Sequence, residues 1–293
     1  MKGIILAGGY GSRLYPLTKY TSKQLLPVYD KPMIYYPLSI FLQAGIKDIL
    51  VITNPEFVAI YQDLLKDGSH LGINIFYKIQ LEPKGIAEAF ILGEDFICQD
   101  NVCLILGDNI FYGKTMEDLL QNCKDNLDIN KCTIIGHEVK DPERFGVVEF
   151  DHDNNVKGVE EKPRTPKSNF AVTGLYFYTN DVVRFAKSLT PSDRGELEIT
   201  DLNNIFIRQE KMLIELMDSA SFKWLDSGTF DALQESSIFI KNEQIKTNSQ
   251  IGLLDEIAYL KEFIDLIQLK KNFNYLSPDL QGYLTKKYFK VDS

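Results

Sequence analysis

Residues 6–14, Leu-Ala-Gly-Gly-Tyr-Gly-Ser-Arg-Leu, decide the fold of this 293-residue chain. They overlap a short apolar segment, residues 3–7, which is typical of a strand buried on both faces. Three glycines then permit a sharp turn and close approach of a ligand, because they carry no Cβ. Successive N–H groups in such a turn form a concave anion site, and Arg13 adds a fixed positive charge. The stretch predicts a loop that binds a triphosphate.

Two common phosphate-binding loops do not fit this stretch. A Walker loop ends in Lys followed by Ser or Thr, and no such pair closes this one. A dinucleotide-binding fingerprint places a third glycine where this chain has Leu14. On these residues alone, an ordinary turn from strand to helix is the alternative.

The composition is that of a soluble globular protein, with 44% hydrophobic and 25% charged residues. A formal net charge of −9 argues against nucleic acid or an anionic membrane as a partner. No apolar run approaches the roughly 20 residues of a membrane span. The amino terminus enters a strand directly and resembles no signal peptide, so we expect a cytoplasmic protein.

The four cysteines form no Cys-x-x-Cys pair, which predicts free buried thiols in place of a metal or redox site; they are Cys98, Cys103, Cys123 and Cys132.

The first half of the chain alternates two kinds of segment. Apolar strand-like runs occur at residues 3–7, 46–53, 73–78, 102–106 and 133–138. Helical patterns separate them at residues 33–44, 55–67, 85–95 and 116–123. This order predicts an α/β fold with a Rossmann-like, mostly parallel sheet flanked by helices. Ligands of such sheets bind beyond the carboxyl ends of the strands, where the glycine loop and Asp108 both fall.

The pattern changes after Phe145. Residues 146–150 and 156–160 flank a turn-rich connection at 151–155, which predicts a β-hairpin. Residues 169–178 predict a strand in which Gly174 marks either close approach of a ligand or a bulge. Helices are expected at 181–189 and 201–209, and a helical region follows Phe230.

We therefore expect a catalytic core at residues 1–230, with a nucleotide half at about 1–140 and a sugar-phosphate half at about 141–230. Residues 231–293 would form a helical region for packing, oligomer contacts or regulation. In that region Ile238, Ile240 and Ile245 are predicted to share one face, and a second apolar stripe comprises Leu253, Leu254, Ile257, Leu260, Ile264 and Ile267.

The loop continues with Pro16 and then with residues 22–39, Ser-Lys-Gln-Leu-Leu-Pro-Val-Tyr-Asp-Lys-Pro-Met-Ile-Tyr-Tyr-Pro-Leu-Ser. With this continuation the sequence resembles the sugar-nucleotide pyrophosphorylases, in the form that acts on dTTP and glucose 1-phosphate. The resemblance implies a nucleotidyltransferase that makes dTDP-glucose and pyrophosphate, the first step of dTDP-rhamnose or related deoxysugar synthesis for polysaccharides. It also implies a Mg²⁺ cofactor, a homotetramer and feedback inhibition by a dTDP-sugar.

Two aspartates are the expected metal ligands. Asp108 closes residues 102–108 after a buried strand, where a carboxylate either holds Mg²⁺ or caps the next helix. Asp226, in Trp-Leu-Asp-Ser-Gly-Thr at residues 224–229, is by itself a plausible helix N-cap. The resemblance implies that both bind the metal, and that Arg13 and Lys23 are catalytic with them.

The same resemblance implies a nucleotide-binding set: Leu6, Gly8, Gly9, Gly11, Ser12, Arg13, Gln24, Gln80 and Gly85. The amide of Gln80 can satisfy both N3–H and a carbonyl of thymine or uracil, so this residue type suits a pyrimidine. Glu88 departs from the family pattern, which has Gln at this position.

For the sugar phosphate, the implied residues are Gly146, Glu161, Lys162, Val172, Tyr176 and Arg194. Carboxylates accept from sugar hydroxyls, and Lys or Arg side chains bind phosphate oxygens. Without the resemblance, Glu161 and Lys162 read as part of a solvated edge.

The chain has three histidines, and none lies in these motifs. This suits the expected reaction, because the sugar phosphate is already an anionic nucleophile and needs no general base. Three alternatives stay open: a uridylyltransferase or other sugar-1-phosphate nucleotidyltransferase, a nicotinamide-dependent oxidoreductase, and a catalytically inactive binding subunit. Lys114 departs from the histidine that is common in the family, which leaves the regulatory residues unassigned.

Overall fold

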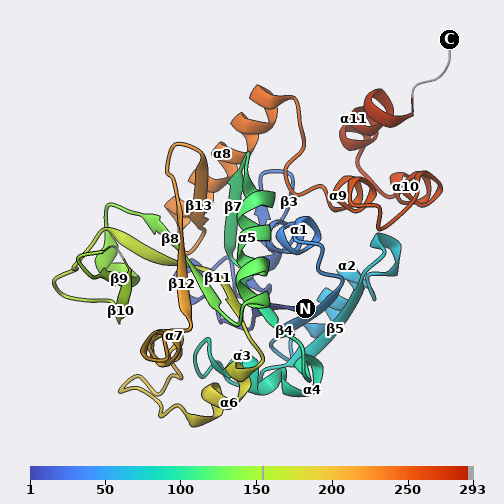
Figure 1. The fold of residues 1–293 in the computed structure, drawn as a ribbon. Coiled ribbons are helices and arrows are strands. Elements are labelled where there is room, and N and C mark those ends of the chain that lie inside the picture. The colour runs from blue at the N-terminus through green and yellow to red at the C-terminus, as the bar shows by residue number, and fades with distance from the viewer. Residues whose placement is uncertain (154, 290–293) are drawn as a thin grey trace.

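The described residues, 1–153 and 155–289 of the computed structural model, contain a nine-stranded central sheet (Figure 1). Its main path runs β10-β9-β11-β6-β1-β4-β5, while β8 pairs with β11 and with β12. The strands are β1 Lys2–Ala7, β4 Asp48–Thr53, β5 Asn74–Ile79, β6 Val102–Leu106, β8 Cys132–Glu138, β9 Gly146–Phe150, β10 Val156–Glu161, β11 Phe170–Tyr178 and β12 Met212–Met217. β6, β1, β4 and β5 pair in parallel. The predicted α/β fold is confirmed.

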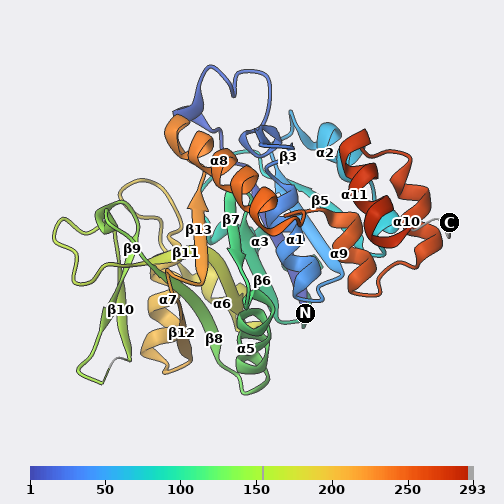
Figure 2. The ribbon, with the colours of Figure 1, turned by 90° about the horizontal axis from the view of Figure 1, so that it is seen from above.

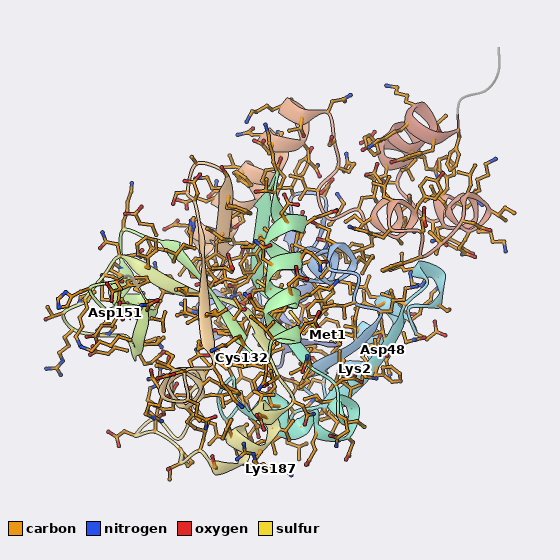
Figure 3. All side chains as sticks on the ribbon, viewed as in Figure 1. Met1, Lys2, Asp48, Cys132, Asp151 and Lys187 are labelled. Carbon is orange, nitrogen blue, oxygen red and sulfur yellow. The ribbon has the colours of Figure 1, made fainter. Side chains whose placement is uncertain are left out.

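The amino and carboxyl ends of the parallel strands carry different features. At the amino edge, Lys2 of β1 lies beside Asp48 of β4, with 3.2 Å between Nζ and Oδ2 (Figure 3). The strands then run in register from Gly3 opposite Ile49 to Ala7 opposite Thr53. The glycine loop and residues 107–108 therefore leave the sheet together at its carboxyl edge.

Helices cover both faces because successive side chains of a strand point to opposite sides. Ile5 belongs to the core that includes side chains of α1 (Tyr35–Gln43) and α5 (Met116–Asp128). Ile4, the preceding residue, belongs to the opposite core, which includes side chains of α3, α6 and α7. That second layer comprises α3 Glu88–Leu92, α4 Glu94–Ile97, α6 Asp181–Ser188 and α7 Ile199–Arg208.

The C-terminal helices pack against the amino-terminal half of the chain (Figure 2). They are α8 Phe230–Thr247, α9 Leu254–Leu260, α10 Leu266–Phe273 and α11 Pro278–Tyr288. Leu254, Leu269 and Leu284 are buried in the same core as Ile5. Glu256 of α9 is also buried and accepts hydrogen bonds from Tyr283, Lys287 and Tyr288, which join α9 to α11. The division of the chain near residues 140 and 230 stays a prediction.

Several strands were not expected from the sequence. β7 (Asn109–Gly113) follows β6 directly and pairs with β13 (Phe222–Asp226), and β12 joins the edge of the sheet beside β8. A further short pair is formed by β2 (Pro27–Val28) and β3 (Lys31–Pro32). Residues 212–226 carry no clear alternation, so sheet pairing decides their conformation.

The predicted helices occur with altered limits. The helix expected at 85–95 is two short helices, α3 and α4, separated by Gly93. The helix expected at 55–67 is α2, Val58–Leu65. The predicted hairpin of β9 and β10 is confirmed, although Asn154 in its connection lies outside the described residues.

One prediction about side-chain burial, that of the four cysteines, is wrong in part. Cys98 is exposed, whereas Cys103, Cys123 and Cys132 are free and buried as expected. Ile240 is buried on α8, but Ile238 and Ile245 are 50% and 67% exposed. The second apolar stripe is divided between α9 and α10, which leaves Leu260 and Ile267 exposed.

Among the described residues, no helix combines the length and apolar character that crossing a membrane requires.

Candidate active site

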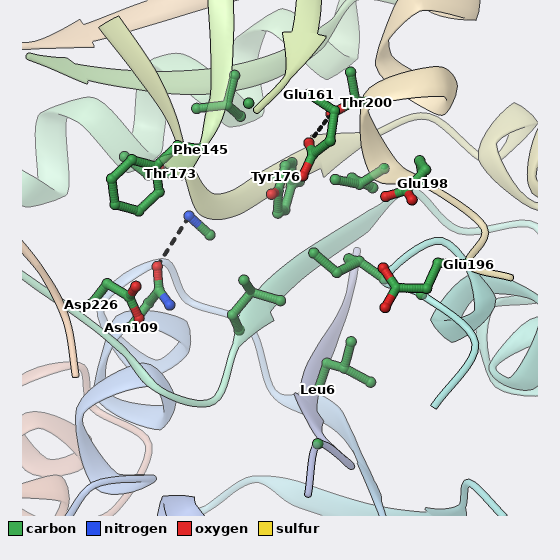
Figure 4. Close-up of a pocket in the computed structure, with 18 of the residues that line it drawn as sticks. Leu6, Asn109, Phe145, Glu161, Thr173, Tyr176, Glu196, Glu198, Thr200 and Asp226 are labelled. Atoms are coloured by element: carbon green, nitrogen blue, oxygen red, sulfur yellow. Dashed lines mark hydrogen bonds between the residues drawn. The ribbon is translucent and has the colours of Figure 1, made fainter. Parts of the chain in front are cut away.

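A cavity of about 660 Å³ opens at the carboxyl edge of the sheet (Figure 4). This volume is in the range of ligand-binding pockets. Figure 4 shows Asp226 and Asn109 on one side of the cavity and Glu161 and Thr200 on another. Most of the expected site residues line it: Leu6, Gly9, Arg13, Gln80, Gly85, Asp108, Gly146, Glu161, Lys162, Val172, Tyr176, Arg194 and Asp226.

The two aspartates meet although 118 positions separate them in the sequence. β7 begins with Asn109, immediately after Asp108, and its pairing with β13 places Asp226 opposite Asn109. The backbone N–H of Ser227 also donates to the carbonyl of Asp108 at 3.3 Å. The helix-cap alternatives are wrong, because a strand follows Asp108 and Thr229 is the N-cap of α8.

Opposite charges surround this pair of carboxylates. The ammonium of Lys23, which is nearly buried, donates to Oδ2 of Asp108. Burial raises the pKa of Asp108, but the charge and hydrogen bond of Lys23 outweigh it and leave that pKa below its ordinary value. Burial, and next the charge of Asp108, raise the pKa of Asp226, and Lys23 and Arg13 partly offset this. The guanidinium of Arg13 lies beside Asp226 at Gly228.

Asn109 connects the two strands that carry the aspartates. Its Nδ2 donates to Oδ1 of Asp108 at 2.9 Å, and its Oδ1 accepts from Nε1 of Trp224 at 2.6 Å. The same Oδ1 accepts from the N–H of Gly174 at 3.2 Å, in β11 (Figure 4). One buried amide therefore links its own strand, β7, to β13 and β11.

We expect Asn109→Ala to lower the free energy of unfolding by roughly 3 kcal/mol, because it leaves the Trp224 and Gly174 N–H groups buried without an acceptor. Guanidinium denaturation measures this. Asn74→Ala is the matched control: Asn74 is exposed and bonds only at the surface to Asp48, so a change within about 0.5 kcal/mol is expected. Equal effects of the two substitutions would contradict the bridging role of Asn109.

The structure confirms the bulge at Gly174, and close approach of a ligand there stays a prediction. The pairing of β11 with β8 shifts register between Val172 and Tyr176, so Gly174 sits in an irregularity. It also lines the cavity and approaches Asn109 so closely that a Cβ would lie 2.5 Å from Oδ1.

The glycine loop packs directly against Gln80 at the end of β5. A Cβ on Gly8 would lie 2.1 Å from Oε1 of Gln80, so this contact requires glycine. Gly11 adopts the left-handed conformation at φ 60° and precedes a 3₁₀ turn, Ser12–Leu14. Arg13 is thereby turned toward the cavity.

Five expected residues are absent from the lining: Gly8, Gly11, Ser12, Lys23 and Gln24. Gln24 was expected to face the nucleotide, but its Oε1 accepts from the hydroxyl of Ser22 at 2.7 Å. Ser22 in turn shares a 2.7 Å hydrogen bond with Tyr61. Gln24 is therefore buried in a hydrogen-bonded group with Ser22 and Tyr61.

At the end of the cavity where a sugar phosphate is expected, carboxylates hold the guanidinium of Arg194 in place. Arg194 donates to both carboxylate oxygens of Glu198, at 2.8 and 2.9 Å, and lies 3.5 Å from Oε1 of Glu161. Glu161 also accepts from the hydroxyl of Thr200 at 2.6 Å (Figure 4). Lys162 is half exposed beside Glu161, so both cations face the opening.

Two polar atoms in the wall have no hydrogen-bond partner among the described residues. They are Oγ1 of Thr173 and Nδ2 of Asn203, and both residues are fully buried. Buried polar groups are rarely left unpaired, and both of these residues line the cavity.

Sequence reasoning missed several residues of the site. Asn109 follows Asp108 within the same motif, and Glu198 and Thr200 stand in the segment that contains Arg194. Their positions beside recognised residues were the available signal. Trp224 was seen only as part of the Asp226 motif, because its hydrogen bond to Asn109 spans 115 positions.

The aspartate pair suits a magnesium ion. Mg²⁺ is commonly held by one or two protein carboxylates, with waters and substrate phosphates completing the octahedron. Asp108 and Asp226 supply two carboxylates, and no cluster of three or more His, Cys, Asp or Glu side chains suited to a metal occurs in residues 1–153 and 155–289.

Comparisons with known proteins agree with this geometry. Residues 2–243 match the sequence model of the family described as nucleotidyl transferase. A glucose-1-phosphate thymidylyltransferase of Neisseria gonorrhoeae is 55% identical over 282 residues, 96% of this chain and 97% of that protein. The enzyme of that name from Xanthomonas campestris pv. campestris (strain B100) is 48% identical over 97% of this chain and 96% of its own.

Solved structures share the fold. A Bacillus anthracis protein, provisionally assigned as a glucose-1-phosphate thymidylyltransferase and crystallised with sucrose, superposes with a TM-score of 0.75. It is 41% identical, and the match covers 82% of this chain and 94% of that one. A UDP-glucose pyrophosphorylase in complex with UDP-glucose has a TM-score of 0.71 and 23% identity, covering 83% of this chain and 98% of that one. The latter likeness concerns the fold alone.

Proposed function

The chain belongs to the nucleotidyl transferase family, and from this premise we propose that it is a glucose-1-phosphate thymidylyltransferase. It would convert dTTP and α-D-glucose 1-phosphate into dTDP-glucose and pyrophosphate. One observation supports the proposal: a single cavity is lined by the glycine loop with Arg13, by the Asp108–Asp226 pair, and by a separate cation, Arg194, set among carboxylates.

Different cations would bind the triphosphate and the phosphate of the sugar. Arg13 and Lys23 would compensate charge on the triphosphate, since they lie beside Asp226 and Asp108. Arg194 and Lys162 would hold the phosphate of the sugar in line with the α-phosphorus, and Glu161 would accept from sugar hydroxyls. Tyr176 and Val172 would form the wall beside the sugar.

Asp108 and Asp226 would hold Mg²⁺, which when bound neutralises charge on the phosphates during transfer. The protein then needs no general base, because the attacking phosphate oxygen is already anionic. Catalysis would depend on positioning and charge compensation, which the buried contacts of Asn109 and Lys23 maintain.

Pyrophosphate release tests this proposal, with glucose 1-phosphate, Mg²⁺ and each of dTTP, UTP, CTP, ATP and GTP. We expect release to require the sugar phosphate and to be fastest with dTTP. Equal or better use of UTP would make the protein a uridylyltransferase with the same site. No release from any of the five nucleotides would overturn the proposal.

The finer assignments rest on the family resemblance of the sequence and are proposals too. The product would supply dTDP-rhamnose or another deoxysugar for polysaccharides, in the cytoplasm. The chain would form a homotetramer inhibited by a dTDP-sugar, and the exposed Ile238 and Ile245 of α8 are candidates for subunit contacts. Sedimentation tests the tetramer, and pyrophosphate release with and without the dTDP-sugar tests the inhibition.

A further inference from the structure

Glu88 contacts Gln80, the residue that the family resemblance assigns to the nucleobase. It is the first residue of α3, and its Oε2 accepts from Nε2 of Gln80 at 2.6 Å. The same oxygen accepts from the backbone N–H of Lys84 at 3.1 Å. Two donors from the segment after β5 therefore converge on one carboxylate oxygen.

These contacts determine which way the Gln80 amide points. The two ends of a glutamine amide have nearly the same shape, so hydrogen-bond partners decide its orientation. An ionised carboxylate only accepts, which obliges Gln80 to turn Nε2 toward Glu88. Oε1 then lies at the glycine loop, where a Cβ on Gly8 would be 2.1 Å away. Gln80 is 3% exposed and lines the cavity, so its amide is held in the cavity wall with Oε1 beside the glycine loop.

A hydrogen-bond acceptor that is fixed at this position would distinguish thymine and uracil from cytosine. The N3 position of thymine and uracil carries a hydrogen that Oε1 of Gln80 can accept, and the second hydrogen of Nε2 is left for a carbonyl of the base. Cytosine has an unprotonated N3, which would meet Oε1 as acceptor against acceptor. A binding site strongly rejects a ligand that leaves the buried polar groups of the site unpaired.

We propose that Glu88 is a positioning residue for nucleotide specificity: it holds the Gln80 amide in the orientation that accepts thymine and uracil and excludes cytosine. The inference rests on the proposed function, because it takes Gln80 as the reader of the base. It goes beyond that function in assigning the choice of amide orientation to Glu88, which acts through Gln80.

The test compares kcat/KM for dTTP, UTP and CTP in three proteins: the parent chain, Glu88→Ala and Glu88→Gln. Alanine removes the acceptor and lets the Gln80 amide turn, so we expect the preference for dTTP over CTP to fall about tenfold. UTP should change in parallel with dTTP, since both present N3–H. The Glu88→Gln side chain retains an oxygen that can accept from Lys84 and Gln80, but it is uncharged. We therefore expect the preference for dTTP over CTP to fall by an intermediate factor of about threefold.

Glu94→Ala is the matched control, because Glu94 is likewise the first residue of a short helix, α4, and pairs with Lys187 away from the cavity. Its nucleotide preference should equal that of the parent chain. If Glu88→Ala lowers kcat/KM for all three nucleotides by the same factor, or leaves their ratios unchanged, the positioning role is overturned.

Titration calorimetry, which measures the binding of dTTP and CTP, distinguishes a failure of the proposed function from a failure of the role proposed for Glu88. If the parent chain releases no pyrophosphate, the proposed function fails, and binding preference then decides the role of Glu88. A dTTP preference that weakens in Glu88→Ala supports the role, and an unchanged preference, or none in the parent chain, overturns it.

Discussion

Replacing Asp108 with Asn should lower pyrophosphate release from dTTP about a thousandfold, which would be the largest effect of any single substitution proposed for this protein. The amide has the same shape but lacks the negative charge that Asp108 shares with Asp226. Lys23 would also lose its ionic partner, although Asp226 still supplies a charge nearby. Initial rates at saturating Mg²⁺ measure the loss, and Asp226→Asn should behave alike.

Two controls separate chemistry from folding. Asp63→Asn makes the same chemical change on the exposed surface of α2 and should leave the rate unchanged. Thermal unfolding of Asp108→Asn should show a single cooperative transition, as in the parent chain. Activity of Asp108→Asn within tenfold of the parent chain would remove Asp108 from the metal site.

Replacing Gly85 with Ala should destabilise the protein by about 3 kcal/mol or more. Gly85 has φ +97°, a conformation that residues with a Cβ rarely adopt. A Cβ there would lie 2.3 Å from the carbonyl oxygen of Leu197 and 2.6 Å from its nitrogen. These are backbone atoms, held by hydrogen bonds from Leu197 N–H to Lys84 and from Ala87 N–H to Leu197, so they cannot move aside without breaking that contact.

Denaturant unfolding measures the cost, and Gly282→Ala is a control with the opposite expected sign. Gly282 lies within α11, where an added Cβ meets no atom within 4 Å. Alanine there should stabilise the chain by roughly 0.5–1 kcal/mol, because it restricts the unfolded backbone. Unchanged stability of Gly85→Ala would mean that residues 85 and 197 separate without cost.

The phosphate loop and the parallel strands were predictable because their signals are local. Ile4 and Ile5 belong to one apolar run, and residues 8–13 follow it directly. The signals for the strand, the turn and the positive charge therefore all lie within ten residues. The amphipathic pattern of α5 likewise gives its buried side from Met116, Leu119, Leu120, Cys123 and Leu127 alone. Hairpin β9–β10 follows from a turn between two apolar runs.

The strands β12 and β13 could not be predicted, because partners from distant parts of the chain stabilise them. Met212–Met217 is half exposed along β8, and Phe222–Asp226 pairs only with β7 among the described residues. Their residues have no strict alternation, since a two-stranded pair and a sheet edge tolerate mixed side chains. Family resemblance, and not spacing, had to connect Asp226 with Asp108.

By itself, the sequence determined the α/β class, the order of the first strands and helices, and the residue types needed for phosphate and metal. Only the tertiary structure decided which of those residues face the cavity: Lys23 pairs with Asp108, Gln24 turns to Ser22, and Glu88 turns the amide of Gln80. The physical reason is the distance along the chain over which each interaction acts. Strand and turn preferences act over a few residues, whereas the direction of a buried polar group is chosen by partners that only the folded chain brings within hydrogen-bonding distance.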